Sequence, residues 1–456
     1  MSGISSWQRR VRGVARLKAG ALGISLALLA AACGSGSPSS TNAPKGVTKT
    51  VTIVAEDGNY GTPGRVQVWN EAATAFDKLH PGVHVVMKSQ SFAQLEKAGI
   101  LELSSSNAPS VFEANEGYLS LGQFVKDHLL VPLDSYAAEY HWLSRQSPTL
   151  IDLDGRQTAT AIGTGQLWGL SATGDWVGVF YNKKLLTKIG QSVPTTFNQF
   201  VHDMALAKAA GTIPLATSGG AGSDQLFHAW YLTLLAQDPS MAQVRDLVLG
   251  IGKQSWANPA VERAAATLVQ WADAGYFSPG YAGITNEAAI AQFTAGKALF
   301  LITGNWNTSV VAPMGATVGM FPLPSDTPAH GPEGIATGGL TWTIPVHGPH
   351  HALAAQFINF LTGPQVAQMF LKTDQIPATT VPGESTMVSG MTKDALVGWR
   401  TLSAGSAPMP YPDWSTPDFY NQLVALTVEL TAHRISPQQF GAQLEQDYVQ
   451  FRQTLG

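Results

Sequence analysis

The chain has 456 residues, more than one ordinary hydrophobic core accommodates, and this length favours two lobes. It carries 27 basic and 31 acidic side chains, and five of the basic ones precede residue 33, where no acidic residue occurs. Removing that segment leaves 22 basic against 31 acidic side chains, a net charge of −9, and so acidic a surface disfavours binding to nucleic acid or anionic lipid.

The first 33 residues have the pattern of an export signal. A basic stretch at 9–18 precedes an apolar run at 19–32, which is too short to span a bilayer comfortably. The run ends in three alanines followed by Cys33, the only cysteine of the chain. This ending resembles a lipoprotein signal, in which the cysteine is acylated and becomes the new N-terminus. A plain secretory signal with an Ala-x-Ala cleavage site is the alternative.

Two further expectations follow from this region. Residues 34–47, rich in Ser, Thr, Gly and Pro, are typical of a flexible tether. A single cysteine excludes an intramolecular disulfide framework and a Cys-rich zinc site. We therefore expect residues 1–33 to be a lipoprotein signal segment, followed by a tether and a soluble body that holds no metal.

From residue 51 the chain alternates short apolar runs with helical patterns, which predicts an α/β fold. In the first part, three successive β-α units predict a parallel sheet with ligands beyond the carboxyl ends of its strands. Trp69 falls on a helical apolar stripe and is assigned to the core. The strands are expected at 51–55, 83–87 and 110–114, and the helices at 69–79 and 92–103.

A second α/β region begins near residue 168. Trp271 lies on one of its helical stripes and is also assigned to the core. Gly296 is well placed to cap a helix at its C-terminus. The strands are expected at 177–181 and 298–302, and the helices at 183–189, 197–210, 227–235, 260–274 and 287–295.

Three groups of motifs, in a fixed order over about 210 residues, carry a specific resemblance. The first comprises Trp168-Gly169-Leu170, residues 179–185 and residues 194–197; the second, residues 291–298 and Gly304-Asn305-Trp306; the third, Gly338-Gly339-Leu340, residues 354–362 and residues 375–378. Together they resemble the family 1 extracellular solute-binding proteins of carbohydrate ABC transporters, the group that includes maltose-binding protein.

The resemblance implies a type II periplasmic-binding-protein-like fold, in which two discontinuous α/β lobes are joined by a hinge. The first lobe would comprise 48–174 and 321–361, and the second 175–320 and 362–456. A sugar or short oligosaccharide would be held in the cleft between them and handed to the permease subunits of an ABC importer. The resemblance also implies a monomer without catalytic activity or cofactor, held by lipid at the extracellular face of the cytoplasmic membrane.

A sugar presents hydroxyl groups at its edge and apolar C–H groups on its faces, so its site needs short polar side chains and flat aromatic rings. Both kinds occur in predicted strand-end loops and at a predicted lobe crossing. By resemblance, Trp306 matches a tryptophan that stacks on sugar. The candidate ligand-binding residues are Asp57, Asn59, Tyr60, Asn115, Glu116, Tyr118, Asp175, Trp230, Trp306, Gly338, Trp342 and Trp414.

Several candidates have an equally ordinary structural interpretation. Asp57 and Glu116 are placed where they could instead cap the helices that follow them. Trp230 and Trp342 are as well explained by core packing, and Trp414 by packing between lobes. Gly338 is explained either by close approach of the backbone to a ligand or by a tight turn.

Two other functions remain open at the level of sequence. A lipid-anchored glycoside hydrolase or lyase would need two carboxylates roughly 5 to 9.5 Å apart across one glycosidic bond, and Asp57, Glu116 and Asp175 could supply them. The same fold could also take a cargo other than sugar. Arg65 is the only basic side chain near the proposed loops, which weakens the case for an anion.

Overall fold

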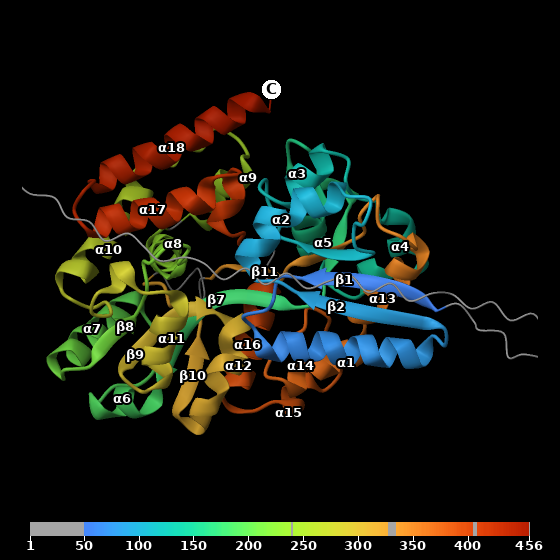
Figure 1. The fold of residues 1–456 in the computed structure, drawn as a ribbon. Coiled ribbons are helices and arrows are strands. Elements are labelled where there is room, and N and C mark those ends of the chain that lie inside the picture. Colours follow the sequence, from blue (N-terminus) through green and yellow to red (C-terminus); the bar gives the residue numbers. More distant parts are fainter. Residues whose placement is uncertain (1–49, 239, 327–333, 405–407, 456) are drawn as a thin grey trace, which may run out of the picture. The chain divides into compact units, whose positions relative to one another are not determined.

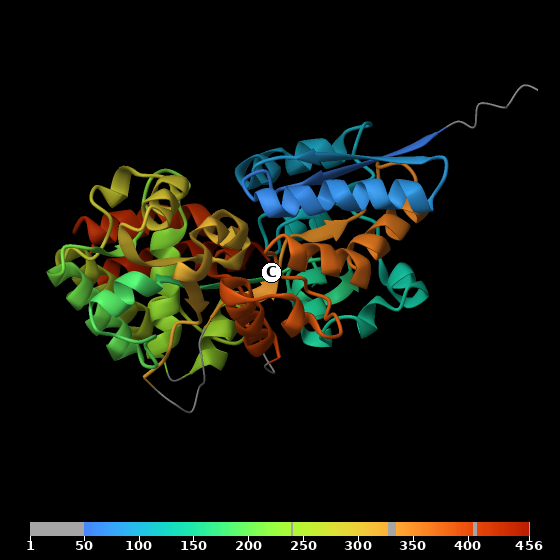
Figure 2. The ribbon, with the colours of Figure 1, turned by 90° about the horizontal axis from the view of Figure 1, so that it is seen from below.

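The computed structural model describes residues 50–238, 240–326, 334–404 and 408–455. The predicted signal segment and tether, and Cys33 with them, lie outside the described residues. Within the described part, helices and strands are organised around two sheets, and Figure 2 separates the two groups. The blue, teal and orange segments surround the first sheet, and the green and yellow segments with the red helices surround the second.

The first sheet has the strand order β2-β1-β3-β12-β6. Its first three strands are parallel, as the sequence predicts, and β12 pairs antiparallel with both β3 and β6. Two strands from much later in the chain therefore complete a sheet that begins with the first strand. The bounds are β1 Val51–Asp57, β2 Val83–Ser89, β3 Val111–Ala114, β6 Gly169–Ser171 and β12 Thr341–Thr343.

The helix α1 (Pro63–Leu79) begins with a proline in its first turn and packs along β2 (Figure 1). It buries Trp69, which is 1% exposed, as the helical stripe predicts, whereas Leu79 at its last position is 59% exposed. The core around Trp69 includes Phe370 of α14 (Pro364–Lys372), at a ring separation of 5.1 Å. The helix α14 follows the predicted lobe boundary at 361, yet it packs on α1 among the elements around the first sheet.

The remaining elements of this group are mostly short. The helix α2 (Phe92–Ser104) starts with a capping box between Ser91 and Gln94, which satisfies two backbone N–H groups at its N-terminus. The other elements are α3 Leu121–Lys126, α4 Asp134–Glu139, α5 Pro148–Gly155, β4 Arg156–Gln157, β5 Ile162–Leu167 and α13 His351–Leu361.

The second sheet has the order β10-β7-β9-β8, and β11 also pairs with β7. Every residue of β7 and β9 is buried, as expected for strands covered on both faces. The strand β7 is the longest and runs antiparallel to β9, β10 and β11. The bounds are β7 Gly174–Asn182, β8 Ile213–Ala216, β9 Ala298–Gly304, β10 Val318–Phe321 and β11 Ala336–Gly338.

Helices from two distant parts of the chain cover this sheet. Figure 1 shows α17 and α18, the red helices near the C-terminus, beside α8 and α10, and the contacts between these helices agree. The helices are α6 Lys183–Lys188, α7 Phe197–Ala209, α8 Gln225–Gln237, α9 Met241–Leu249, α10 Pro259–Asp273, α11 Asn286–Thr294, α12 Thr308–Val311, α15 Glu384–Met387, α16 Gly390–Ser403, α17 Phe419–Thr431 and α18 Pro437–Thr454.

The strands and helices expected from the sequence are all present, with ends that shift by a few residues. Gly296 follows α11 with a φ of +71°, and Trp271 is 2% exposed in α10, as predicted. The exact lobe boundaries stay a prediction. Near them, β11 pairs with β7 of the second sheet, and α14 packs on the first sheet's group.

Candidate ligand-binding site

The loop after β1 is organised by Asp57, whose side chain is fully buried. One carboxylate oxygen accepts the backbone N–H of Asn59 at 2.9 Å, and the other accepts the hydroxyl of Ser89 at 2.7 Å. Burial nevertheless raises the pKa of Asp57 to about 6. Thr62 is the residue at the start of α1, so Asp57 shapes the loop and does not cap that helix.

Glu113, in the middle of β3, was not predicted to belong to the site. Its Oε2 accepts a hydrogen bond from the side-chain amide of Asn59 at 2.6 Å and from the backbone N–H of Gly58 at 3.1 Å. It is 2% exposed, and burial followed by repulsion from Asp57 raises its pKa well above the ordinary value. A carboxylate inside the apolar run of a short strand was the signal that could have identified it.

Arg65 connects this loop to the second sheet. Its guanidinium forms an ion pair with Asp175 of β7, and the two residues are 3% and 6% exposed. Its Nε donates to Oε1 of Gln375 at 3.0 Å, and its Nη1 donates to Oδ1 of Asn59 at 3.3 Å. One side chain at the start of α1 therefore contacts the first loop, β7 and the segment after α14.

Glu116 and Asp154 form a second carboxylate pair, 3% and 2% exposed. The Oδ2 of Asp154 accepts the backbone N–H of Gly338 at 2.7 Å. Its Oδ1, and Oε1 of Glu116, have no hydrogen-bond partner among the described residues. Burial raises the pKa of both carboxyls well above ordinary values, and the nearby Asp154 raises that of Glu116 further. We call Asp57, Glu113, Glu116, Asp154 and Asp175 the carboxylate group.

Aromatic rings gather beside these carboxylates. The ring centroids of Trp306 and Tyr411 lie 6.3 Å apart, those of Tyr411 and Trp414 6.0 Å apart, and the ring of His228 lies 6.2 Å from both Trp306 and Tyr411. Burial raises the pKa of Tyr411 well above the ordinary value, and Asp175, Asp413 and Glu116 raise it further. We call Trp306, Tyr411, Trp414 and His228 the aromatic group.

The start of α8 adds unpartnered polar atoms to this region. Gln225 and His228 are 1% and 2% exposed. Nε2 of Gln225 has no hydrogen-bond partner among the described residues, and Nδ1 of His228 lies 3.8 Å from Oδ2 of Asp224, too far for a hydrogen bond. Burial lowers the pKa of His228, which favours the neutral imidazole. Beside them, the amide of Asn286 donates to Asp224 at 2.8 Å and accepts the hydroxyl of Ser218 at 2.6 Å. Buried polar groups without protein partners are expected to bind water or a ligand.

The model of the bacterial extracellular solute-binding protein family matches residues 62–368. The chain belongs to this family.

Two curated sugar-binding proteins match parts of this chain at low sequence identity. The multiple sugar-binding protein of Streptococcus mutans is 21% identical over 217 residues, which is 46% of this chain and 51% of the relative. The glucose-binding protein of Saccharolobus solfataricus is 26% identical over 195 residues, 42% of this chain and 33% of the relative. The matched segments therefore span about half and a third of these relatives.

Solved structures cover nearly the whole chain. A chitin oligosaccharide binding protein has a TM-score of 0.75 at 19% identity, covering 89% of this chain and 100% of that one. The GacH receptor of Streptomyces glaucescens, solved unliganded and with acarbose, has a TM-score of 0.72 at 18% identity, covering 89% and 99%. These likenesses confirm the predicted type II periplasmic-binding-protein-like fold.

The fold does not bring all the predicted ligand-binding residues together. Trp230 is fully buried in α8, with its ring 6.1 Å from Trp256 and 5.0 Å from Phe440. Trp342 is fully buried in β12, with its ring 5.2 Å from that of Trp69. For both residues this burial among other rings agrees with the core-packing interpretation.

Other candidates lie at the edge of the site or are held elsewhere. Tyr60 is 71% exposed, and Asn115 is half-buried beside Glu116. The hydroxyl of Tyr118 donates to the carbonyl of Thr160 at 2.9 Å, and Arg452 of α18 donates to it at 3.2 Å. Tyr118 therefore joins the loop after β3 to the C-terminal helix.

The structure also bears on the alternatives considered for Gly338, Glu116 and Trp414. Gly338 lies in β11 and donates its N–H to Asp154, so it orients a carboxylate of the site. Ser120 is the residue at the start of α3, so Glu116 does not cap that helix. Trp414 is 1% exposed and packs against the loop at Gly117, the packing alternative considered for it.

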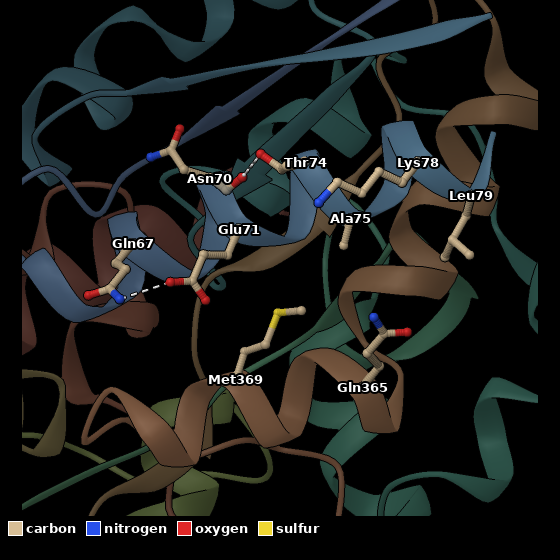
Figure 3. Close-up of a pocket in the computed structure, with 9 residues that line it drawn as sticks. All are labelled: Gln67, Asn70, Glu71, Thr74, Ala75, Lys78, Leu79, Gln365 and Met369. Atoms are coloured by element: carbon tan, nitrogen blue, oxygen red, sulfur yellow. Dashed lines mark hydrogen bonds between the residues drawn. The ribbon is translucent and has the colours of Figure 1, made fainter. Parts of the chain in front are cut away.

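A hollow on the surface lies between α1 and α14 and is distinct from this site (Figure 3). Six of its nine lining residues are of polar type, but the surface that they expose to the hollow is mostly apolar. The amide of Gln67 donates to Glu71 across one turn of α1 at 2.9 Å. Ala75, Leu79 and Met369 are its apolar residues. It has no aromatic ring and no buried polar group, so it lacks the features that a sugar site requires.

Neither a metal site nor a membrane span is evident in the part of the chain that the structure describes. No three His, Cys, Asp or Glu side chains there are placed to hold a metal ion together, the carboxylate group included. No helix among these residues is both long and apolar enough to cross a membrane.

Proposed function

We propose that this chain captures a sugar or short oligosaccharide outside the cell and delivers it unaltered to the permease of an ABC importer. The observation that carries the proposal is the placement of the aromatic group beside the carboxylate group. Gly117, next to Glu116, packs on Trp414, and Gln375 joins Arg65 to the backbone of Trp306. Trp306 and Tyr411 supply ring faces, and the adjoining carboxylates supply hydrogen-bond acceptors that the protein leaves partly unused. This combination suits the apolar faces and the hydroxyl edge of a sugar ring.

The names of the relatives support the same class of cargo, since two are described as sugar-binding and one as binding chitin oligosaccharide. The burial of the site supports a hinge mechanism. Arg65 ties α1 to β7 in the observed state, so ligand exchange requires the two groups of elements to separate. The permease would then receive the sugar from the opened form.

A thermal-shift screen of the purified chain against a panel of mono- and oligosaccharides tests the proposal. We expect a dissociation constant near micromolar, about −8 kcal/mol. At a hundredfold excess over that constant, the ligand adds about 2.7 kcal/mol to the free energy of unfolding. A panel without any stabilising sugar, confirmed by calorimetric titration, would reject the proposal.

One observation favours a second candidate, a glycoside-cleaving enzyme. Glu116 and Asp154 are two buried carboxyls with raised pKa values, and Asp154 contributes to the raised pKa of Glu116, a feature shared with acid–base pairs. Incubation with the sugars that bind, followed by chromatography, separates the candidates. Intact sugar supports the binding protein, and cleaved sugar that disappears in Glu116→Gln supports the enzyme.

We further propose that Cys33 carries a lipid and holds the protein at the extracellular face of the cytoplasmic membrane. The sequence pattern before Cys33 is the support for this proposal. In cells producing the full chain, the protein should fractionate with membranes and partition into detergent. Cys33→Ala should release it into the aqueous phase, and unchanged partitioning would reject the anchor. Size-exclusion chromatography with light scattering tests the proposed monomer.

A further inference from the structure

The carboxylate group contains more carboxyls than its protein partners could balance in the ionised state. All five members are at most 6% exposed. In the described part of the chain, the pair of Arg65 with Asp175 is the only ion pair that a member of this group forms. Burying unpaired charge is costly, so the remaining carboxyls must hold protons or receive a cation.

Hydrogen bonds divide these remaining carboxyls into two kinds. Asp57 and Glu113 accept bonds from Ser89, from Asn59 and from the backbone of Gly58, so the protein itself satisfies them. Glu116 and Asp154 each keep one oxygen without a donor among the described residues. An unsatisfied buried acceptor costs about 1–3 kcal/mol, and more when charged, so a donor from outside the chain is expected at this pair.

The unpartnered oxygens lie where the sugar is proposed to bind. The backbone N–H of Gly338 fixes one oxygen of Asp154 and leaves the other free. Glu116 lies within electrostatic range of Tyr411, and Gly117 beside it packs on Trp414. Nε2 of Gln225 also has no hydrogen-bond partner among the described residues. Gln225 lies one turn before His228, whose ring packs on those of Trp306 and Tyr411. Buried polar atoms without a hydrogen-bond partner thus occur both at the carboxyl pair and at the start of α8.

We propose that the sugar bound by this site carries a protonated amine, and that Glu116 and Asp154 accept its hydrogen bonds. The inference rests on the proposed sugar-binding function and specifies its cargo. An ammonium group has three donors and a positive charge, so it can satisfy both free oxygens and also balance the pair. A hydroxyl donates one neutral hydrogen bond and leaves the charge unbalanced. Hydrogen bonds between ionised partners are about twice as strong as neutral ones.

Calorimetric titration of the full chain with glucosamine disaccharide and with its N-acetylated counterpart tests the inference. The two probes have the same ring and linkage and differ at nitrogen, which is an ammonium in one and a neutral acetamide in the other. At about pH 7, below the ordinary pKa of an amine, the amine-bearing probe should bind at least about tenfold more tightly, a difference of about 1.4 kcal/mol. Equal or tighter binding of the N-acetylated probe would overturn the inference.

Two variants test whether the preference for the amine-bearing probe depends on Glu116 and Asp154. Glu116→Gln and Asp154→Asn keep the side-chain shape and remove the charge, so each should reduce the tenfold preference to about twofold or less. Asp203→Asn is the matched control: Asp203 is 2% exposed in α7 and lies outside the carboxylate group, so its replacement should leave the preference unchanged. An unaltered preference in both site variants would also overturn the inference.

The two proposals fail in different ways. If neutral sugars bind well and Trp306→Ala weakens them, the sugar-binding function holds and the amine preference is wrong. If neither probe nor any neutral sugar binds, the sugar-binding function itself is wrong, and the inference fails with it. Because the comparison between probes uses the unmodified chain, it remains decisive even if a variant does not fold.

Discussion

Arg65 at the start of α1 and Asp175 in β7 form a buried ion pair that links the two sheets' groups of elements. The guanidinium also donates to Gln375 and Asn59, so each of its three nitrogens has an acceptor. A buried charge pair with this many hydrogen bonds fixes one arrangement of the groups it joins. It is therefore a structural contact between the two groups, and the proposed hinge motion would have to break it.

Replacement of Arg65 by Met should destabilise the chain strongly. It leaves Asp175 buried without its counter-charge, which costs about 3–5 kcal/mol. The double variant Arg65→Met/Asp175→Asn should recover part of this loss, because the remaining partner is then neutral. Urea denaturation of the wild type, both single variants and the double variant gives the coupling energy. Strictly additive losses would show that the pair contributes nothing as a pair.

Trp306→Ala should weaken saccharide binding at least about tenfold, or about 1.4 kcal/mol, because the sugar loses one stacking face. Trp168→Ala is the matched control, since Trp168 is also half-buried but donates its indole N–H to the carbonyl of Gln157 at 2.6 Å outside the aromatic group. Titration of both variants with one sugar measures the difference. An unchanged affinity for Trp306→Ala would remove this residue from the site.

Thermal stability should fall as the pH rises from about 5 to 8. Burial raises the pKa of Asp57 to about 6, that of Asp413 to about 7 and that of Glu96 to about 8. Between the ordinary pKa values and these raised ones, the folded chain binds more protons than the unfolded chain, so raising the pH favours unfolding. Melting temperatures at constant ionic strength measure the trend, and a rising or flat profile contradicts it.

Glu96→Gln isolates one contribution to this profile. Its carboxyl accepts the hydroxyl of Ser120 at 2.9 Å, and its other oxygen has no partner among the described residues. A neutral amide cannot lose a proton as the pH rises, so the variant should show a shallower fall in melting temperature up to about pH 8. A slope identical to that of the wild type would show that Glu96 does not titrate as its burial implies.

Gly117→Ala should destabilise the loop after β3 by about 1–3 kcal/mol. Gly117 has a φ of +81°, and a Cβ there would lie 2.7 Å from the backbone Cα of Trp414. Gly163→Ala is the control, because Gly163 has a similar φ of +79° but its nearest atom is 3.9 Å away. Urea midpoints should fall further for Gly117→Ala, and equal shifts would show that backbone strain alone is responsible.

Trp230 should contribute to the stability of the fold by core packing and not to sugar binding. Trp230→Ala removes a fully buried ring and should cost about 3–5 kcal/mol of the free energy of unfolding. Trp230→Phe keeps an aromatic ring in place, so the folded variant should bind sugar within about threefold of the wild type. Denaturation and titration measure the two effects. A stable Trp230→Phe without binding would return this residue to the site.

Local sequence patterns determined the secondary structure and the fold class. The apolar runs of β1 and β2 and the apolar stripe of α1 each depend on residues a few positions apart, so the sequence predicted them without the tertiary structure. The start of α1 at Pro63, six residues before the predicted one, was not predicted. The motifs that include Trp306 and Gln375 indicated the family for the same reason, because their order along the chain is itself the signal.

Only the tertiary structure decided which of these side chains meet. Asp154 and His228 have no unusual sequence neighbours, and their place in the site depends on elements more than a hundred residues away. Glu113 is visible in the sequence as a carboxylate within a strand, but its partner Asn59 lies 54 residues earlier. The same applies to Trp230 and Trp342, whose rings are covered by distant elements. The sequence thus determined the elements and the family. Burial, charge balance and ring contacts depend on long-range packing, which no local pattern encodes.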